Sequence, residues 1–428
     1  MATKLNAISV PHHKNTHESE TVTMPVPGKV TILMSQHMGA PCELMVQEGD
    51  QVKVGQIIAD TTAFLSAPIH SSVSGTVENI TEVKMPNGNS VAAAVIKSDG
   101  QQTLHESAAP PVFIDKEGFL AAVRSSGLVG LGGAGFPAHI KFNPAQQVTA
   151  LVVNAAECEP FISADYRTIM EDEQYLLDGI RYIMEYVGLS KCIIGVEDNK
   201  PAAIEKLKSL QADGRFTVMP LKSKYPKGAE KVLVYETTGQ TVPEGKLPAD
   251  VGVIVSNVTS VAVLGKYMKD GIPLVSKRLT VDGGAVTNPG NIRVPVGTAI
   301  SDIIDFCGGY KGELKKLLRG GPMMGTAMYD DSFPIIKSDN AIIAFDAVQF
   351  EEYTESPCIR CGRCMRSCPM RLMPLRIEDC FNRDDVQGMR KHKVNLCVEC
   401  GCCAYECPAK RNLVQTFRLA KARLARDR

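Results

Sequence analysis

Residues 358–369 read C-I-R-C-G-R-C-M-R-S-C-P, and residues 397–408 read C-V-E-C-G-C-C-A-Y-E-C-P. Both stretches follow the pattern C-x2-C-x2-C-x3-C-P, which is typical of domains that hold two four-iron clusters. Three closely spaced thiolates can face three irons of one cube, while the turn enforced by the proline directs the fourth cysteine towards the other cube. This part of the chain therefore predicts an α-helical domain built around two [4Fe–4S] clusters.

The crossed arrangement, as in bacterial ferredoxins with two clusters, assigns four cysteines to each cluster. The assigned ligands are Cys358, Cys361, Cys364 and Cys407 for one cluster, and Cys397, Cys400, Cys403 and Cys368 for the other. A pair of structural zinc sites is the alternative, but zinc ligands often come as two C-x2-C pairs and fit this spacing poorly. We expect Cys402 to lie beside a cluster without binding it, and Cys380 to be buried.

The two motifs differ in charge. Four arginines lie in or just after the first motif, whereas Glu399 and Glu406 lie in the second. Positive charge favours the more negative, reduced state of a cluster, so we expect the first cluster to have the higher reduction potential. The arginines equally fit a docking face for an acidic partner or a solvated surface.

The size and composition of the chain indicate a multidomain protein. Its 428 residues are 44% hydrophobic and carry a formal net charge of zero, so nothing in the charge points to nucleic-acid binding. The cysteines outside the two motifs have no disulfide-like spacing, which fits a reducing compartment. No stretch approaches the ~18 apolar residues of a membrane span, and no signal-peptide pattern is present. We therefore expect a soluble or peripheral protein.

The first hundred residues contain short strands separated by turns. Residues 1–27 are expected to be extended and poorly determined. Within residues 28–100, the turns at 48–50 and 54–56 resemble those of biotinyl/lipoyl carrier domains, which are flattened barrels of two similar halves. Those carriers modify a lysine at the hairpin between the halves, but residues 60–64 here contain none. The resemblance implies a barrel-sandwich docking module without a swinging arm.

A glycine-rich loop follows a Pro-containing linker at 100–112 and an amphipathic helix capped by Asp115. An ordinary dinucleotide fingerprint has a strand directly before its glycines, whereas here a helix precedes them and a strand at 148–154 follows. We therefore expect the loop to cradle a phosphate or a flavin with bare amides in another topology; a merely flexible loop is the alternative. The loop glycines are Gly130, Gly132, Gly133 and Gly135.

Polar residues surround the next strand. Lys141 is a candidate phosphate clamp, and Asn154, Glu157 and Glu159 lie at the carboxyl end of the strand. Ligands of α/β sheets bind at such ends, so we expect these side chains to contact a cofactor. Simple surface charges at a turn are the alternative for the two glutamates.

The remaining segments complete the domain pattern. Strands and helices alternate from 163 to 275, with one long helix expected at 165–187, which predicts an α/β domain with a mostly parallel sheet. Residues 276–330 form a small α+β unit, and its loop at 319–325 is expected to pack on the flavin or the cluster domain. The basic amphipathic helix at 411–428 could contact anionic lipid or a partner, or dock on its own chain.

The glycine loop and the segment Asn154–Pro160 resemble the flavoprotein subunit of respiratory complex I. That family carries a G-x-G-G-A-G-F-P loop, a nearby lysine, an N-x-D-E-S-E-P segment and an N-N-V segment. The resemblance implies FMN in the site with NADH stacked upon it, followed by a β-grasp, SLBB-like domain. It implies that FMN is held by Gly130, Gly132, Lys141, Asn154 and Asn257, that Phe136 stacks on the nicotinamide nucleotide, and that Glu159 binds its ribose. The chain departs from the family pattern at Leu131, Ala156 and Ser256.

The order of the parts resembles the RnfC family of Rnf electron-transport complexes over nearly the entire chain. This resemblance implies an FMN- and iron–sulfur-containing subunit of a membrane-bound ferredoxin:NAD oxidoreductase, an enzyme that couples electron transfer to ion translocation. It implies an iron–sulfur subunit and integral membrane subunits as partners, at the cytoplasmic face of the membrane. The alternatives are a soluble NADH-dependent reductase, such as a cobalamin reductase, and an electron-wire subunit that lacks FMN.

We therefore expect five successive parts. They are a barrel-sandwich module at 1–100, an α/β FMN/NADH-binding domain at 113–275, a β-grasp domain at 276–345, a two-cluster ferredoxin-like domain at 346–410 and a basic helix at 411–428.

Overall fold

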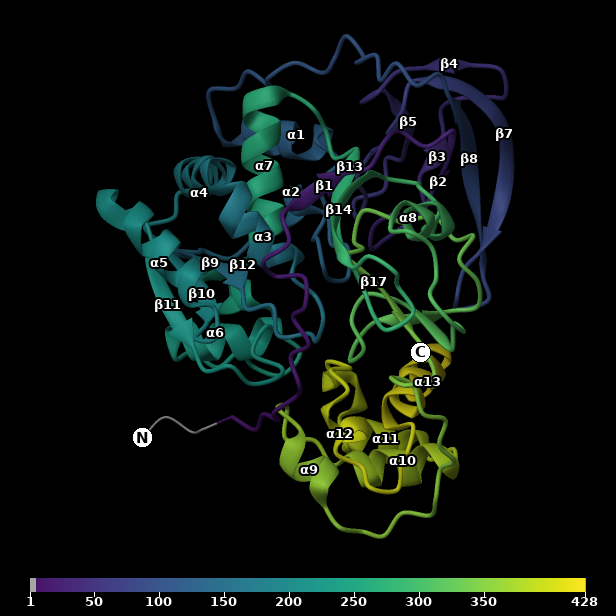
Figure 1. Ribbon diagram of the computed structural model, residues 1–428. Helices are drawn as coiled ribbons and strands as arrows, with labels where there is room; N and C mark the ends of the chain where they lie inside the picture. The colour runs from purple at the N-terminus through teal and green to yellow at the C-terminus, as the bar shows by residue number, and fades with distance from the viewer. Residues whose placement is uncertain (1–4, 428) are drawn as a thin grey trace.

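The computed structural model describes residues 5–427, apart from the side chains of residues 212 and 213. Figure 1 shows the α/β domain in teal, the β-rich regions in blue and green, and the C-terminal helices in yellow below them. The purple N-terminal segment runs upward between the teal and green regions to strand β1 (Thr21–Thr23).

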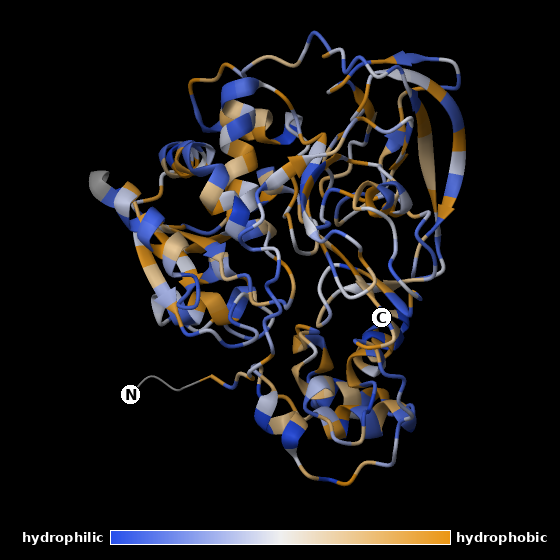
Figure 2. Cartoon of the chain, in the orientation of Figure 1, coloured by the Kyte–Doolittle hydropathy of each residue, from blue (hydrophilic) through white to orange (hydrophobic). Residues whose placement is uncertain are grey.

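The barrel-sandwich module consists of two small antiparallel sheets around one core. Their strand orders are β2-β8-β7-β4 and β3-β5-β6. Hydrophilic and hydrophobic residues alternate along β7 (Figure 2), as expected for a strand with one face on a core. The strands are β2 (Lys29–Leu33), β3 (Glu43–Leu44), β4 (Gln51–Val52), β5 (Ile57–Asp60), β6 (Ile69–His70), β7 (Gly75–Lys84) and β8 (Ser90–Ser98).

The α/β domain is built on a parallel sheet of order β11-β10-β9-β12. Leu151 and Val153 of β9 face one hydrophobic core, whereas Val152 faces a second core under α6. Helices therefore cover both faces, which explains why the strands are almost entirely apolar. The elements are α1 (Lys116–Ser125), α2 (Ala138–Lys141), β9 (Ala150–Ala155), α3 (Ala164–Glu171), α4 (Glu173–Val187), β10 (Lys191–Glu197), α5 (Pro201–Ser209), η1 (Leu210–Asp213), β11 (Thr217–Leu221), α6 (Glu230–Thr238), η2 (Pro248–Val251), β12 (Val253–Asn257) and α7 (Val258–Asp270).

The expectation of one long helix at 165–187 is wrong, because the chain breaks into α3 and α4 at Asp172. This residue has φ −116° and ψ 28°, outside the helical region. Its carboxylate lies 2.9 Å from the Arg278 guanidinium and 3.4 Å from that of Arg293, both on neighbouring strands. Ion pairs with residues a hundred positions away thus accompany the break.

The β-grasp domain has a six-stranded mixed sheet of order β1-β14-β13-β17-β15-β16. Helix α8 covers it with Ile300, Ile303 and Ile304, which are buried in the same core as the sheet. The elements are β13 (Ser276–Asp282), β14 (Gly290–Pro295), α8 (Ile300–Phe306), β15 (Lys316–Arg319), β16 (Thr326–Met328) and β17 (Ala341–Phe345).

Residues 5–23, here called the N-terminal strap, contradict the expectation of a poorly determined start. Asn6 Nδ2 donates to Cys368 O (3.1 Å), and Ile8 forms an antiparallel bridge with Tyr225. At its far end the strap becomes β1 (Thr21–Thr23), which pairs in parallel with β14. The strap therefore contacts the cluster, α/β and β-grasp domains in turn.

The C-terminal domain is a set of short helices around the two cysteine motifs. Helix α13 is docked on this domain, because Leu413, Phe417, Ala420 and Leu424 are buried in its core. Within residues 5–427, no helix combines the length and apolar character needed to cross a membrane. The elements are α9 (Arg363–Ser367), α10 (Pro374–Asn382), α11 (Val386–Lys391), η3 (Val394–Leu396), α12 (Cys402–Tyr405) and α13 (Leu413–Arg426).

Candidate functional site

The glycine-rich loop lies between α1 and α2 and presents bare backbone. The Gly130 N–H donates to Phe136 O (2.8 Å), and the Gly132 N–H donates to Ser338 O (3.2 Å) of the β-grasp domain. Gly132 has φ +74°, a conformation that glycine adopts without strain. Gly133 has open space where a side chain would stand, and its N–H has no acceptor among the described residues. The loop can therefore offer the Gly133 amide group to an anionic ligand.

The barrel-sandwich module contacts this loop through hydrogen bonds. The Met38 N–H donates to Gly135 O (2.9 Å). Lys337 Nζ donates to Pro68 O (2.7 Å) and to Gly127 O (2.8 Å), so it joins three domains next to the loop. Burial lowers the pKa of Lys337 to about 7. The barrel-sandwich module therefore supports the glycine-rich loop through these hydrogen bonds. The docking role expected from the sequence stays a separate prediction.

Asn154 and Asn257 lie opposite each other at the carboxyl ends of β9 and β12. Asn257 caps α7, because its Oδ1 accepts from the Thr259 N–H (2.9 Å), while its Nδ2 donates to Asp165 Oδ2 (2.7 Å). Asn154 Nδ2 donates to Gly228 O (2.9 Å). Both predicted side chains are therefore held at the sheet edge where α/β folds bind ligands.

A third asparagine, Asn340, reaches the loop from the β-grasp domain. A Cβ placed on Gly132 would lie 3.2 Å from Asn340 Nδ2 and 3.9 Å from Asn257 Nδ2. Two amide groups thus converge on the glycine loop, and that of Asn340 has no hydrogen-bond acceptor among the described residues. Sequence reasoning missed Asn340, because no motif connects it with the loop.

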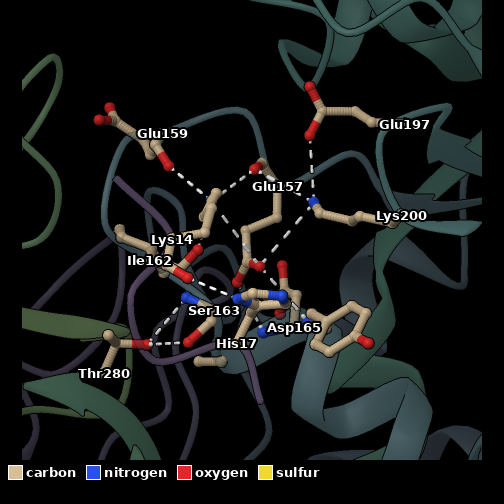
Figure 3. Close-up of polar contacts among 12 residues, drawn as sticks. Lys14, His17, Glu157, Glu159, Ile162, Ser163, Asp165, Glu197, Lys200 and Thr280 are labelled. Atoms are coloured by element: carbon tan, nitrogen blue, oxygen red, sulfur yellow. Dashed lines mark hydrogen bonds and ion pairs between the residues drawn. The ribbon is translucent and has the colours of Figure 1, made fainter. Parts of the chain in front are cut away.

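Glu157 is buried, so its alternative interpretation as a surface charge is wrong. Its carboxylate accepts from the Asp165 N–H (2.7 Å) and lies 4.0 Å from Lys14 Nζ and 3.9 Å from Lys200 Nζ (Figure 3). Burial raises the pKa of Glu157 to about 7, against the opposing effect of the two lysines. Lys200 is in turn paired with Glu197 at 3.1 Å. The segment after β9 therefore carries a buried charge network.

Glu159 points towards the β-grasp loop at 319–325. One carboxylate oxygen accepts from the Met323 N–H (3.1 Å), and the other is buried without a hydrogen-bond partner among the described residues. Burial raises the pKa of Glu159 to about 7. A side chain at Gly321 would collide with this carboxylate. The free oxygen is chemically suited to accept from a ribose hydroxyl.

Lys141 and Phe136 are half-buried at the loop. Lys141 Nζ lies 3.2 Å from Glu230 Oε1, in the first turn of α6. A phosphate group would therefore compete with Glu230 for this lysine. The free Gly133 amide, converging asparagine amides and an unpaired carboxylate oxygen together fit a flavin phosphate and a nucleotide ribose.

Five cysteines line one cavity together with Phe417: Cys368, Cys397, Cys400, Cys402 and Cys403. Burial raises the pKa of Cys397 to about 11, and the nearby Cys400 and Cys368 also raise it. The cavity therefore contains the four cysteines of the crossed assignment together with Cys402. No three His, Cys, Asp or Glu side chains between residues 5 and 427 are placed to hold a single metal ion. Ligands of a four-iron cluster bind different irons and need no such arrangement.

The other four cysteines lie nearer the surface. Cys358 and Cys361 are exposed, and Cys364 and Cys407 are half-buried. Burial raises the pKa of Cys364, and the neighbouring Cys407 and Cys358 raise it further. Three members of this predicted quartet are therefore electrostatic neighbours.

A shared hydrophobic core joins the α/β domain to the buried quartet. Cys158, between the two site glutamates, packs in this core with Tyr225, Cys400 and Cys402. Met323 packs against the same core from the loop that also holds Glu159. The expectation that the loop at 319–325 packs on a neighbouring domain is confirmed for both domains. Cys380 is buried, as expected, and Cys402 is fully buried in the same core as Cys400.

Comparison with known proteins decides the family. One relative is the C subunit of the proton-translocating ferredoxin:NAD(+) oxidoreductase complex of Clostridium ljungdahlii, 42% identical over 93% of this chain and 88% of the relative. Another is the C subunit of the Na(+)-translocating complex of Acetobacterium woodii, 41% identical over 94% of this chain and 92% of the relative. The chain belongs to the RnfC family of ion-translocating ferredoxin:NAD(+) oxidoreductase complexes.

Family models match the RnfC architecture in chain order. The matches are the RnfC barrel sandwich hybrid domain at 4–101, the Nuo51 FMN-binding domain at 123–266, the SLBB domain at 278–327 and the 4Fe-4S dicluster domain at 351–414. The expected fold class, the FMN-binding domain and the two-cluster domain are thereby confirmed. One chain of an air-oxidized NAD+-reducing [NiFe]-hydrogenase is similar in fold, with TM-score 0.53, 18% identity, and coverage of 75% of this chain and 67% of that chain.

Three site-lining residues of this RnfC-family chain escaped prediction from the sequence. Lys14, Asp165 and Asn340 come from the strap, from α3 and from the β-grasp domain. Asp165 lies five residues beyond the Asn154–Pro160 segment, so proximity could have suggested it. Lys14 and Asn340 are distant in sequence, and their positions depend on tertiary contacts alone.

Proposed function

We propose that this chain is the NADH-binding subunit of a membrane-bound ferredoxin:NAD oxidoreductase complex that couples electron transfer to ion translocation. The α/β domain holds FMN and the nicotinamide nucleotide, and the C-terminal domain holds two [4Fe–4S] clusters. FMN, when bound, exchanges an electron pair with the nucleotide and single electrons with iron–sulfur clusters. The protein supplies binding, orientation and an electron route between these cofactors.

The proposal assigns roles to the residues at the site. The loop amides and the amides of Asn154 and Asn257 hold FMN, with Lys141 released from Glu230 to meet its phosphate. Phe136 stacks on the nicotinamide nucleotide, and the free oxygen of Glu159 accepts from its ribose. The remaining FMN-contacting residues are Gly130, Gly132, Gly133, Gly135 and Glu157.

One observation carries this function: the core shared by Cys158, Tyr225, Met323, Cys400 and Cys402. It connects the segment between Glu157 and Glu159 directly with the buried cysteine quartet. A hydrogen bond with Cys402 lowers the pKa of Cys400, and the negative charge of Glu159 opposes this effect, which reflects the proximity of Glu159 and Cys400. The cluster held by Cys368, Cys397, Cys400 and Cys403 is therefore the one next to the flavin.

The other quartet provides the exit to a partner. Cys358 and Cys361 are exposed, and the Ile359 side chain between them is 67% exposed. Arg360 and Arg363 are exposed at the same motif. An apolar residue surrounded by arginines suits an acidic iron–sulfur partner subunit. Ion movement belongs to integral membrane subunits, with this chain at the cytoplasmic face of the membrane.

The experiment is an anaerobic NADH titration of the purified, cofactor-loaded chain. NADH is expected to bleach the flavin spectrum and then to produce EPR signals of reduced clusters. A chain that holds both clusters but neither retains FMN nor reacts with NADH would contradict the dehydrogenase role. Co-purification with integral membrane subunits tests the assignment to a complex and separates it from a soluble reductase.

A further inference from the structure

Lys14 of the N-terminal strap places a buried ammonium group at the candidate nicotinamide site. Lys14 lies outside every cofactor motif, yet its Nζ is directed at the turn from Glu157 to Ile162 (Figure 3). We propose that Lys14 is a positioning residue of the flavin–nicotinamide site, which fixes this turn and balances its buried carboxylates. This inference rests on the proposed function.

The turn from Glu157 to Ile162 uses the full hydrogen-bonding capacity of the Lys14 ammonium group. Lys14 Nζ donates to Glu157 O (2.9 Å), to Glu159 O (2.7 Å) and to Ile162 O. An ammonium group has three protons, so all of them serve backbone carbonyls of one turn. Three carbonyls facing inward around one cation orient the Glu157 and Glu159 side chains that leave the same backbone.

The charge of Lys14 also enters the buried network. Glu157 and Glu197 contribute two carboxylates, and Lys14 and Lys200 contribute two ammonium groups. Burial lowers the pKa of Lys14, while Glu157 opposes that effect. Removal of one buried partner leaves an uncompensated charge. Without Lys14, the Glu157 and Glu197 carboxylates would share the single ammonium group of Lys200, next to the proposed ribose-binding Glu159.

A short series of contacts connects Lys14 with the flavin loop. Glu157 accepts from the Asp165 N–H (2.7 Å), and the Asp165 carboxylate accepts from Asn257 Nδ2 and Thr259 Oγ1, both at 2.7 Å. Asn257 lies next to Gly132 of the loop. A shift of the Glu157 turn would therefore displace the residues that cap α7 beside the flavin.

The strap makes separate contacts with the α/β domain on either side of Lys14. The Phe161 N–H donates to His12 O (2.8 Å), and Thr16 Oγ1 lies 2.6 Å from Ser163 Oγ. These contacts use neither the Lys14 charge nor the carbonyl groups that it binds. They allow the effect of a loosened strap to be separated from the effect of the missing ammonium group.

The test compares Lys14→Met with Thr16→Val and Lys14→Arg. Lys14→Met is expected to weaken FMN binding roughly tenfold, because three hydrogen bonds from a charged donor are lost. It is also expected to raise KM for NADH more than it lowers kcat, and to lower the midpoint potential of the flavin. Thr16→Val loosens the strap and is expected to leave these three quantities near wild type. Lys14→Arg keeps the charge and is expected to keep the midpoint potential.

Cluster EPR spectra and thermal unfolding confirm that each variant is folded. Unchanged FMN affinity, KM and midpoint potential in Lys14→Met would overturn the inference. Equal losses in Thr16→Val would also overturn it, because they would assign the effect to the strap as a whole. If Lys14→Met does not fold, Lys14→Arg provides the test. A flavin midpoint potential that differs from wild type although the positive charge is kept would contradict the proposed role of the Lys14 charge. Failure of wild-type protein to bind FMN would instead contradict the proposed function itself.

Discussion

Buried lysines illustrate how single residues acquire their roles in this chain. Lys337 is 1% exposed, and its ammonium group bonds two carbonyl oxygens from two other domains. Lys14 does the same for one turn of the α/β domain. Lysine is among the residues least often buried, so its sequence context alone predicts a surface position. The acceptors come from distant segments, which is why neither lysine was expected at the site.

Lys337→Met is predicted to change how stability depends on pH. Burial lowers the pKa of Lys337 to about 7 from the usual 10.5, so the unfolded chain binds more protons between these values. The contribution to stability is complete above pH 10.5 and is lost as pH falls towards 7. The free energy of unfolding of the wild type should therefore rise by up to about 1.4 kcal/mol per pH unit above pH 7, relative to Lys337→Met.

Denaturant unfolding of both proteins between pH 7 and 9 measures this difference. Lys224→Met is the control, because Lys224 is a lysine of the α/β domain with an exposed hydrogen bond to Ser9 Oγ. Parallel pH profiles for wild type and Lys337→Met would show that the Lys337 pKa is near its ordinary value in the folded chain.

The two cysteine motifs were the part of the candidate site most accessible to prediction. Their spacing is local, and a local pattern can specify which thiols share a cluster. Glu157 was predicted at the right end of its strand, but its burial and its lysine partners were not. The charge network depends on Lys14 and Lys200, which no local pattern connects with Glu157.

Helix α13 shows how an amphipathic element is used. The sequence left open whether its apolar face meets lipid, a partner or its own domain. Phe417 is 1% exposed and lines the cavity of the buried quartet, whereas Leu419 on the opposite face is 48% exposed. The periodicity predicted the helix, but only the tertiary structure identifies its partner.

Phe417→Ala is predicted to destabilise the cluster domain by about 3–5 kcal/mol and to open the cavity of the buried quartet to solvent. Iron should be lost from this cluster first, seen as the earlier loss of one of the two EPR signals during exposure to oxygen. Leu419→Ala on the same helix should stay within about 0.5 kcal/mol of wild type. Equal loss of both clusters in Phe417→Ala would argue against a local role.

The break between α3 and α4 belongs to the same scale. The sequence of residues 165–187 predicts one helix, whereas the structure has two, of which α4 buries Leu176, Ile180 and Ile183. Asp172 leaves the helical conformation where it meets Arg278 and Arg293. These arginines lie on strands of another domain, so the sequence of the helix itself does not reveal the break.

For the whole molecule, the order of domains was predictable and their contacts were not. Motifs identify each domain separately, which is why the sequence indicated the order of parts that the family matches confirm. The β-grasp loop with Met323 and the N-terminal strap join the α/β domain to the buried quartet. These junctions carry no recognisable motif.

Met323→Ala is predicted to slow electron transfer from flavin to clusters without changing the rate at which NADH reduces the flavin. The substitution leaves a void in the core shared by Tyr225 and Cys400, so the two domains lose packed contact there. Met324→Ala is the control, since this neighbouring side chain is 45% exposed. Stopped-flow absorbance resolves the two phases, and slowing in both variants alike would argue against a specific junction.

The central claim is that NADH, FMN and two clusters form one electron route within this chain. Its most direct test is an anaerobic titration with NADH of protein whose metal content is known, followed by visible absorbance and EPR. We predict one FMN and about eight irons per chain, with flavin bleaching followed by reduction of two distinct [4Fe–4S] signals. The account would be contradicted by zinc in place of iron, or by a flavin that NADH reduces while both clusters stay oxidised and respond to dithionite alone.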